Sequence, residues 1–147
     1  GGHHVPFFAR WPGKVKAGSE SAQVITHTDL FATVAAIAGA KIPKGAAADS
    51  YSFLPLLLGK AKGYSRPPVI HHSSGGMFAI RDGDWKLVLG NGSGGRQQPR
   101  GRAFEKPFFL ANLKADPAEK TNRVEDEPDK AAALEAAFRK LHADERR

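Results

Sequence analysis

The sequence of 147 residues predicts an α+β fold, in which a small antiparallel sheet is followed by a packed terminal helix. Three observations carry this prediction. Apolar residues alternate on both sides of Asp82-Gly83, a dipeptide typical of two-residue β-hairpins. Beyond Pro128, apolar residues recur at helical spacing. Pro67-Pro68 separates these elements from the first part of the chain, because two consecutive prolines break any helix.

Glycine- and proline-containing segments divide the chain into three regions. We expect residues 1–59 to hold a strand and helices, residues 60–68 to be a linker, and residues 69–147 to form a small subdomain with a four-stranded antiparallel sheet and a terminal helix. The linker prediction rests on glycine, proline and basic residues between two apolar segments.

In the first region, residues 5–11 are apolar and aromatic and predict a buried strand that ends in a turn at Pro12-Gly13. Because the sequence starts at this strand without a Met or a polar lead-in, we expect it to be part of a longer protein. Asp29 is expected to cap a helix that ends at Gly39. The apolar stripe of that helix consists of Leu30, Phe31, Val34, Ile37 and Ala38. A short helix capped by Ser52 should follow over residues 53–58.

In the last region, strands are expected over residues 69–73, 78–81, 84–89 and 108–113. A type I′ turn at Asp82-Gly83 would place Arg81 opposite Asp84. Strand alternation then gives one buried face, formed by Phe78, Ile80, Trp85 and Leu87. The Gly- and Arg-rich residues 90–107 predict a mobile loop.

Composition limits the function classes. The net charge is +7, and residues 1–102 hold 13 Lys and Arg against 5 Asp and Glu, so this part should attract anions such as sulfated sugars or a phosphate backbone. The chain is 41% hydrophobic without a long apolar run, which argues against a membrane span. It contains no cysteine, which excludes disulfides and thiolate metal sites.

Five segments of the sequence resemble, in the same order, motifs of the sulfatase family, of the arylsulfatase type. These segments are Gly1 to Val15, Thr28 to Thr33, Asp49 to Gly59, Phe78 to Leu87 and Asp116 to Asn122. The resemblance implies the C-terminal portion of an alkaline-phosphatase-like α/β sulfatase fold. It also implies sulfuric ester hydrolysis, and export to the periplasm or the outside of the cell. Two positions depart from the family pattern: His4 stands where Arg is usual, and residues 108–113 lack the usual Leu-Tyr-Asp-Leu.

For the complete family enzyme, the resemblance implies a formylglycine nucleophile and a bound calcium ion. The sequence has neither the Cys-x-Pro-Ser-Arg motif, or its Ser-x-Pro-Ser-Arg form, that yields formylglycine, nor the paired aspartates that hold calcium. We therefore expect no catalytic residue and no metal ligand in this chain, and we expect it to be inactive alone. Its partner would be a missing N-terminal catalytic portion, and its substrate a sulfated small molecule or glycan.

Histidines are the candidate substrate-binding residues. They occur in two adjacent pairs, His3-His4 and His71-His72, and adjacent residues of a strand point to opposite faces, which argues against a shared zinc site. The resemblance implies that a His of the C-terminal subdomain reaches the sulfated substrate. We expect His72 to make this contact and His71 to pack behind it, with His4 and His3 as further candidates.

A different class of function stays open. The chain could be a free-standing basic module that binds sulfated glycan or nucleic acid. A nucleic-acid module would expose aromatic residues on a sheet face among Lys and Arg, whereas the predicted hairpin places its aromatic residues on the apolar side. The pattern therefore favours the sulfatase hypothesis over nucleic-acid binding.

Overall fold

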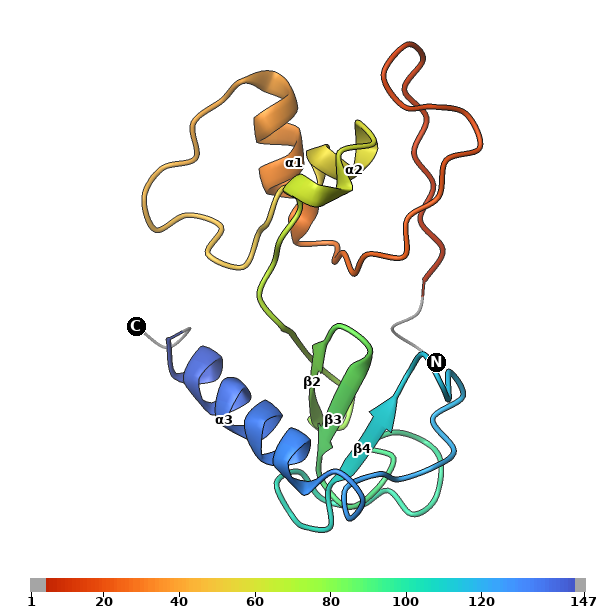
Figure 1. Cartoon of the computed structure of the whole chain (residues 1–147). Helices are drawn as coiled ribbons and strands as arrows, with labels where there is room; N and C mark the ends of the chain where they lie inside the picture. The colour runs from red at the N-terminus through yellow and green to blue at the C-terminus, as the bar shows by residue number, and fades with distance from the viewer. Residues whose placement is uncertain (1–4, 145–147) are drawn as a thin grey trace. The chain divides into compact units, whose positions relative to one another are not determined.

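The computed structural model describes residues 5–144, which fall into two compact units. Unit 1 ends at Arg66 and unit 2 begins at Pro67. Each unit is traced by colour in Figure 1, unit 1 in red to yellow-green and unit 2 in green to blue. The fold of each unit follows from its own sequence pattern.

Unit 1 is helical, with long irregular connections. It contains α1 (Asp29–Ala38), α2 (Leu54–Leu57) and the 3-10 turn η1 (Ala61–Gly63). The buried strand expected over residues 5–11 is wrong, because these residues form no strand and the Phe8 side chain is 91% exposed. An extended segment becomes a strand only when a neighbouring strand pairs with its backbone, and the described part of unit 1 supplies none.

Local sequence rules predict where α1 ends but not which residues cap the starts of α1 and α2. Gly39 ends α1 in the left-handed conformation, with φ of 67°, and its N–H donates to carbonyls of the last turn, as the sequence predicted. The expected cap of α2 is wrong: Phe53 occupies the cap position of α2, and Ser52, one residue before it, only accepts a hydrogen bond from the N–H of Leu54 at 3.3 Å. The expected cap of α1 is also wrong: Asp29 is its first helical residue, and Thr28 occupies the cap position without a side-chain capping bond.

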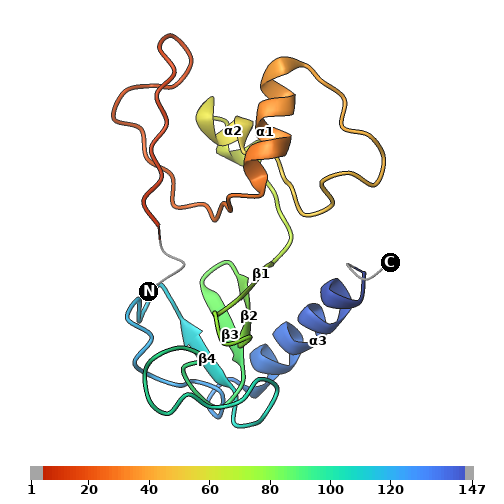
Figure 2. The same cartoon turned by 180° about the vertical axis from the view of Figure 1, so that it is seen from behind.

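Unit 2 is a four-stranded antiparallel sheet in the order β1-β2-β3-β4, covered on one face by α3 (Figure 1, Figure 2). The strands are β1 (Val69–His72), β2 (Phe78–Asp82), β3 (Trp85–Leu89) and β4 (Phe109–Asn112), and the helix is α3 (Pro128–Asp144). The core consists of Ile80, Leu87, Leu89, Phe108, Leu110, Ala131, Leu134 and Phe138. This arrangement confirms the predicted α+β class and the helix that begins at Pro128.

The hairpin between β2 and β3 differs from the prediction in its register. Asp82 pairs with Trp85, so the turn residues are Gly83 and Asp84 instead of Asp82 and Gly83. Gly83 has φ of 54° and Asp84 is not among the residues of positive φ, which is the pattern of a type II′ turn. The slip preserves the pleat, so Ile80 still faces the core and the predicted buried face is confirmed.

The conformation of the turn predicts that alanine substitutions at two glycines of unit 2 change the free energy of unfolding by different amounts. Gly83→Ala should lower the free energy of unfolding by about 1 kcal/mol, because a Cβ is strained at positive φ although the space beside it is open. Gly95→Ala is the matched control, since Gly95 has ordinary φ and its Cβ would meet only the Ser93 carbonyl at 3.9 Å. Urea unfolding of both variants measures the difference. Equal stability of the two would contradict the type II′ turn.

Candidate functional site

His72 ends β1 and is exposed, whereas His71 is half-buried. The pairing of His72 with Phe78 and of His71 with Ala79 places the two histidines on opposite faces of the sheet. His72 Nδ1 lies 2.9 Å from the Ser73 carbonyl oxygen. Because a carbonyl oxygen can only accept, this contact requires the proton on Nδ1 and so orients the imidazole ring.

The His72 ring belongs to an aromatic cluster on the face of the sheet that α3 covers. Phe78 is its centre, with ring-centroid distances of 5.3 to 5.7 Å to four neighbours, His72, Phe104, Phe138 and His142. His142 was not among the residues expected at this site, although its spacing of four residues from Phe138 on α3 predicts that the two rings stack. Phe104 stays 50% exposed, so the cluster presents apolar ring surface beside His72.

Ser73 holds the turn that follows His72. Its hydroxyl accepts from the N–H groups of Gly75 and Met77, at 3.2 and 3.1 Å, and donates to the Gly94 carbonyl at 2.5 Å. The Gly76 N–H also donates to the Ser73 carbonyl. Hydrogen bonds therefore hold this turn together, and the Ser73 hydroxyl bonds to backbone groups instead of facing a substrate.

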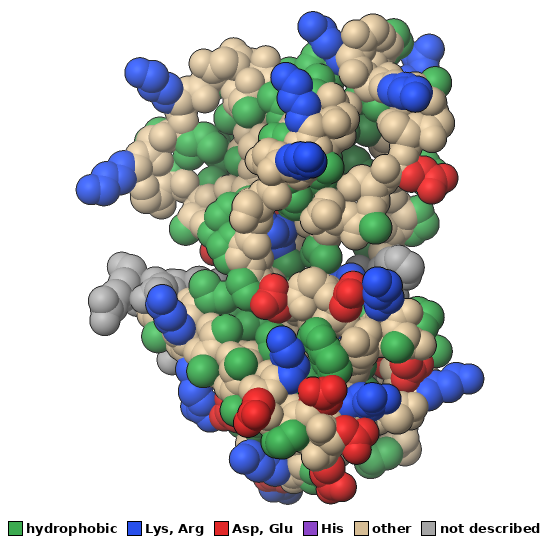
Figure 3. Space-filling view, viewed as in Figure 1, with side chains coloured by type: hydrophobic (Ala, Val, Ile, Leu, Met, Phe, Trp, Pro, Cys, Tyr) green, Lys and Arg blue, Asp and Glu red, His purple; other side chains and the backbone are tan. Residues whose placement is uncertain are grey.

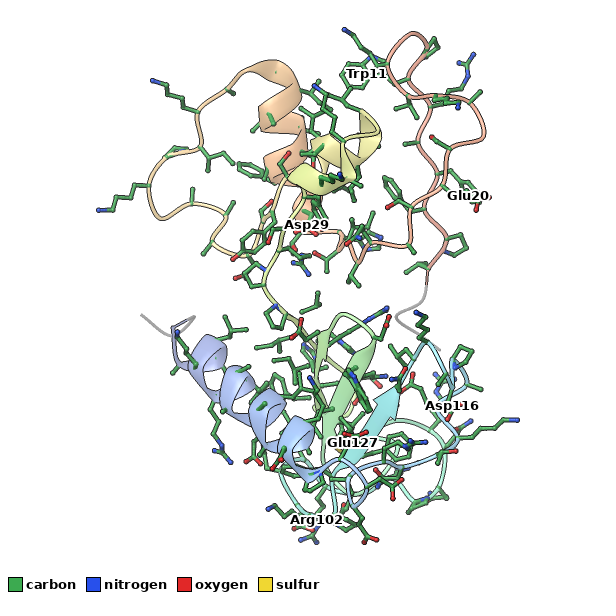
Figure 4. All side chains as sticks on the ribbon, viewed as in Figure 1. Trp11, Glu20, Asp29, Arg102, Asp116 and Glu127 are labelled. Carbon is green, nitrogen blue, oxygen red and sulfur yellow. The ribbon has the colours of Figure 1, made fainter. Side chains whose placement is uncertain are left out.

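The fully buried carboxylate of Asp29 organises unit 1 (Figure 4). It accepts hydrogen bonds from the N–H groups of Thr26 and Tyr51, at 2.8 and 3.0 Å, and lies 3.3 Å from the Arg66 guanidinium. Arg66 also lies over the Tyr51 ring, 5.4 Å from its centroid. These bonds join the start of α1 to residues 22 and 37 positions later, so the carboxylate has a structural role.

The pKa of Tyr64, which lies beside this ion pair, is shifted by its surroundings. Burial raises the pKa of the Tyr64 hydroxyl above its ordinary value, the negative charge of Asp29 raises this pKa further, and the positive charge of Arg66 opposes the rise. The hydroxyl donates to the Val24 carbonyl at 2.6 Å. Tyr64 is therefore held protonated as a hydrogen-bond donor that ties the end of unit 1 to its beginning.

The described residues do not fit the metal or the nucleophile of a complete sulfatase. Within residues 5–144, no three His, Cys, Asp or Glu side chains gather in a way that could hold a metal ion. The sequence contains neither a cysteine nor a Ser-x-Pro-Ser-Arg segment from which formylglycine could form. His3 and His4, the other candidate residues, lie outside the described part of the chain. Over the same described range, no helix combines the length and apolarity needed to cross a bilayer.

Comparison with known proteins identifies relatives of the chain. An N-acetylgalactosamine-6-O-sulfatase of Bacteroides thetaiotaomicron is 31% identical over 139 residues, which cover 87% of this chain and 25% of the relative. A solved sulfatase structure from the glycosaminoglycan metabolism of the same organism superimposes with a TM-score of 0.62 at 28% identity, over 77% of this chain and 24% of that one. No protein-family model matches the chain.

A further solved structure shares the fold at lower identity. It was determined in complex with its substrate D-glucosamine-2-N,6-O-disulfate, and it superimposes with a TM-score of 0.68 at 21% identity over 91% of this chain and 27% of that one. The resemblance first carried by five motifs is confirmed: the curated relatives and the structural neighbours are sulfatases of the alkaline-phosphatase-like fold. The chain spans about a quarter of their length.

The buried ion pair of unit 1 predicts a large stability loss when its acid is neutralised. Asp29→Asn should cost about 3 kcal/mol of unfolding free energy, because it leaves the Arg66 charge, 91% buried, without its counter-charge. The exposed Asp82→Asn is the control and should stay within about 0.5 kcal/mol of the parent. Adding Arg66→Met to Asp29→Asn should recover part of the loss. Denaturant unfolding measures all three, and equal effects of Asp29→Asn and Asp82→Asn would contradict the role of the pair.

Proposed function

We propose that this chain, a relative of the sulfatases by sequence and by fold, forms the small-sheet segment and adjoining helices of a sulfuric ester hydrolase. The observation that carries the proposal is the 31% identity over 139 residues to a curated N-acetylgalactosamine-6-O-sulfatase. In this proposal the groups that break the ester, including formylglycine and calcium, lie elsewhere in the complete protein. The chain supplies structure and substrate-side contacts.

The chemistry of the described residues supports this division of roles. The buried carboxylate of Asp29 and the hydroxyl of Ser73, which a catalytic role would need exposed to substrate, are both bonded to backbone groups. His72, by contrast, is exposed at the end of a strand, and its ring is oriented by the Ser73 carbonyl and by contact with Phe78. With Nδ1–H donated to the Ser73 carbonyl, Nε2 accepts from a sugar hydroxyl when the ring is neutral and donates to a sulfate oxygen when the ring is protonated.

The proposed substrate is a sulfated small molecule or glycan, and His72 is its proposed contact. His71, His4 and His3 are proposed as further substrate-side residues. Export of the complete protein is part of the same proposal, since sulfated polysaccharides such as glycosaminoglycans lie mainly outside cells.

One observation favours the alternative of a free-standing basic module. Unit 1 holds eight Lys and Arg against three Asp and Glu, and on the face in Figure 3 its basic side chains outnumber the acidic ones. The hairpin aromatics Phe78 and Trp85 nevertheless pack against the core of unit 2 instead of forming an exposed stacking platform. This packing favours the sulfatase segment.

The proposal predicts opposite effects for the two neighbouring histidines of β1. In the full-length protein, His72→Ala should lower kcat/KM for an aryl sulfate by a factor of about ten to a thousand, the range for one charge-assisted contact, with little change in thermal stability. His71→Ala should mainly lower thermal stability, because it truncates a half-buried side chain. The exposed His27→Ala is the control. Sulfate release and thermal melts measure the effects, and equal losses of activity in the two β1 variants would contradict the site.

The proposal also predicts that unit 1 packs against the rest of a sulfatase. The stripe of α1 is exposed, with Leu30 at 41%, Phe31 at 56%, Val34 at 59% and Ile37 at 44%. The remaining three quarters of the relatives' length make the rest of the fold the proposed occupant. Expressed alone, the chain should therefore bind a hydrophobic dye or self-associate, since large exposed apolar patches are uncommon on monomers.

The double variant Phe31→Ser, Val34→Ser tests this docking face. It should lower dye binding and self-association of the isolated chain by about half or more, because it removes the two most exposed apolar side chains of the stripe. Phe104→Ser, on unit 2, is the control. Sedimentation and dye fluorescence measure the change. A monodisperse parent chain without dye binding would contradict the docking face.

A further inference from the structure

The loop between β3 and β4, residues 90–107, is a basic segment that the proposed function does not use. It carries Arg96, Arg100, Arg102 and Lys106 against a single acid, Glu105. Figure 4 labels Arg102 at the outer side of this loop. We call residues 90–107 the basic loop.

The backbone of the basic loop forms a defined frame. The N–H groups of Ser93 and Gly94 donate to the carbonyls of Pro99 and Arg100, both at 2.9 Å. Gly90 forms a β-bridge with Ala103. The two limbs come so close that a Cβ at Gly92 would lie 2.5 Å from the backbone nitrogen of Gly101. The backbone of the loop is therefore already ordered, so binding of a ligand to its side chains costs little additional backbone entropy.

The arginine side chains project from this frame. Arg96 and Arg100 are exposed, and no ion pair to either is found among the described residues. Arg102 lies 3.4 Å from Glu105, but both side chains are exposed by half or more, so water screens the pair and it is weak. The basic loop thus presents two to three guanidinium groups whose charge is not neutralised by a close acid.

The basic loop is joined directly to the turn that follows His72. The Gly94 carbonyl oxygen accepts hydrogen bonds from the Ser73 hydroxyl, at 2.5 Å, and from the Gly75 N–H, at 3.2 Å. His72 at the end of β1 and the loop after β3 lie at the same end of the antiparallel sheet (Figure 2). Phe104, half-exposed and stacked on Phe78 at 5.7 Å, provides apolar ring surface at this end.

We propose that the basic loop is a second anion-binding site, which holds sulfated sugars of a glycan chain beyond the ester at His72. The proposal rests on the proposed function. A guanidinium fork matches the oxygens of a sulfate group, and its charge persists at every physiological pH. Successive sulfates along a chain can engage successive arginines, while the Phe104 ring receives the apolar face of a sugar. The substrate class is then a multiply sulfated polysaccharide, in preference to a small monosulfate ester.

The test compares two charge-matched double variants of the full-length protein. Arg96→Gln with Arg100→Gln removes two charges from the basic loop, and Lys14→Gln with Lys16→Gln removes two exposed charges from unit 1. The probes are a chondroitin sulfate decasaccharide, unsulfated chondroitin of the same length and a single-stranded DNA decamer. Binding is measured over a range of salt concentrations. Melting temperatures verify that each variant is folded.

The arginine variant should bind the sulfated decasaccharide about tenfold more weakly, and the slope of log affinity against log salt should fall by about one to two, as expected when counterion-releasing contacts are lost. The lysine variant should stay within about twofold, since its charges lie outside the loop. Equal losses in the two variants, no loss in the arginine variant, or equally tight DNA binding with the same arginine dependence would overturn the inference.

Sulfate release from a small aryl sulfate separates the two proposals. The arginine variant should release sulfate at the parental rate, because its substitutions lie outside the His72 contact. If His72→Ala lowers this release while the arginine variant binds the decasaccharide normally, the second site is wrong and the proposed function stands. If the parent binds the decasaccharide through the arginines but releases no sulfate from any sulfated probe, the proposed function is wrong.

Discussion

In unit 2, the amide side chain of Asn122 closes the free edge of β4 and joins it to the segment before α3. Its oxygen accepts the Leu110 N–H and its nitrogen donates to the Phe108 carbonyl, both at 2.9 Å, while the Arg123 N–H donates to the Leu110 carbonyl at 2.8 Å. A bare strand edge would invite pairing with other chains. The same clamp fixes the segment that leads into α3, so the helix starts where Ala131 can reach the core.

Two of the segments that resemble sulfatase motifs, Phe78 to Leu87 and Asp116 to Asn122, make structural contacts in unit 2. In residues 116–122, the Asp116 carboxylate accepts the N–H groups of Lys120 and Thr121, which shapes the turn. Glu119 pairs with Lys86 of β3 at 2.7 Å, and both side chains are largely shielded from water, which strengthens the pair relative to a surface contact. The Lys86–Glu119 pair thus joins two motifs that lie far apart in the sequence. These motifs are evidence for the fold and not, by themselves, for a reaction.

Sequence patterns predicted the features of the fold that depend on residues close together in the sequence. The sheet, its buried face and the start of α3 follow from alternation and from Pro128, all of which are local. Long-range bonds could not be predicted: Asp29 looks like a helix cap in sequence, whereas its partners Tyr51 and Arg66 lie 22 and 37 residues away. The strand expected over residues 5–11 was wrong because a run of apolar and aromatic residues says nothing about the presence of a pairing strand. The placement of His72 beside the basic loop required the Ser73 to Gly94 bond, for which the sequence carries no signal.

The close approach of the two limbs of the basic loop separates two kinds of position. At Gly92 a side chain would collide with backbone atoms, so substitution there would disturb the frame. Arg96 and Arg100 project into solvent, so their replacement leaves the frame intact. Evolution can therefore alter the charge that the loop presents without altering its shape. In the proposed second site, the number of arginines can thus vary with the sulfation density of the polysaccharide while the scaffold stays the same, and the loop offers the same freedom to an engineer.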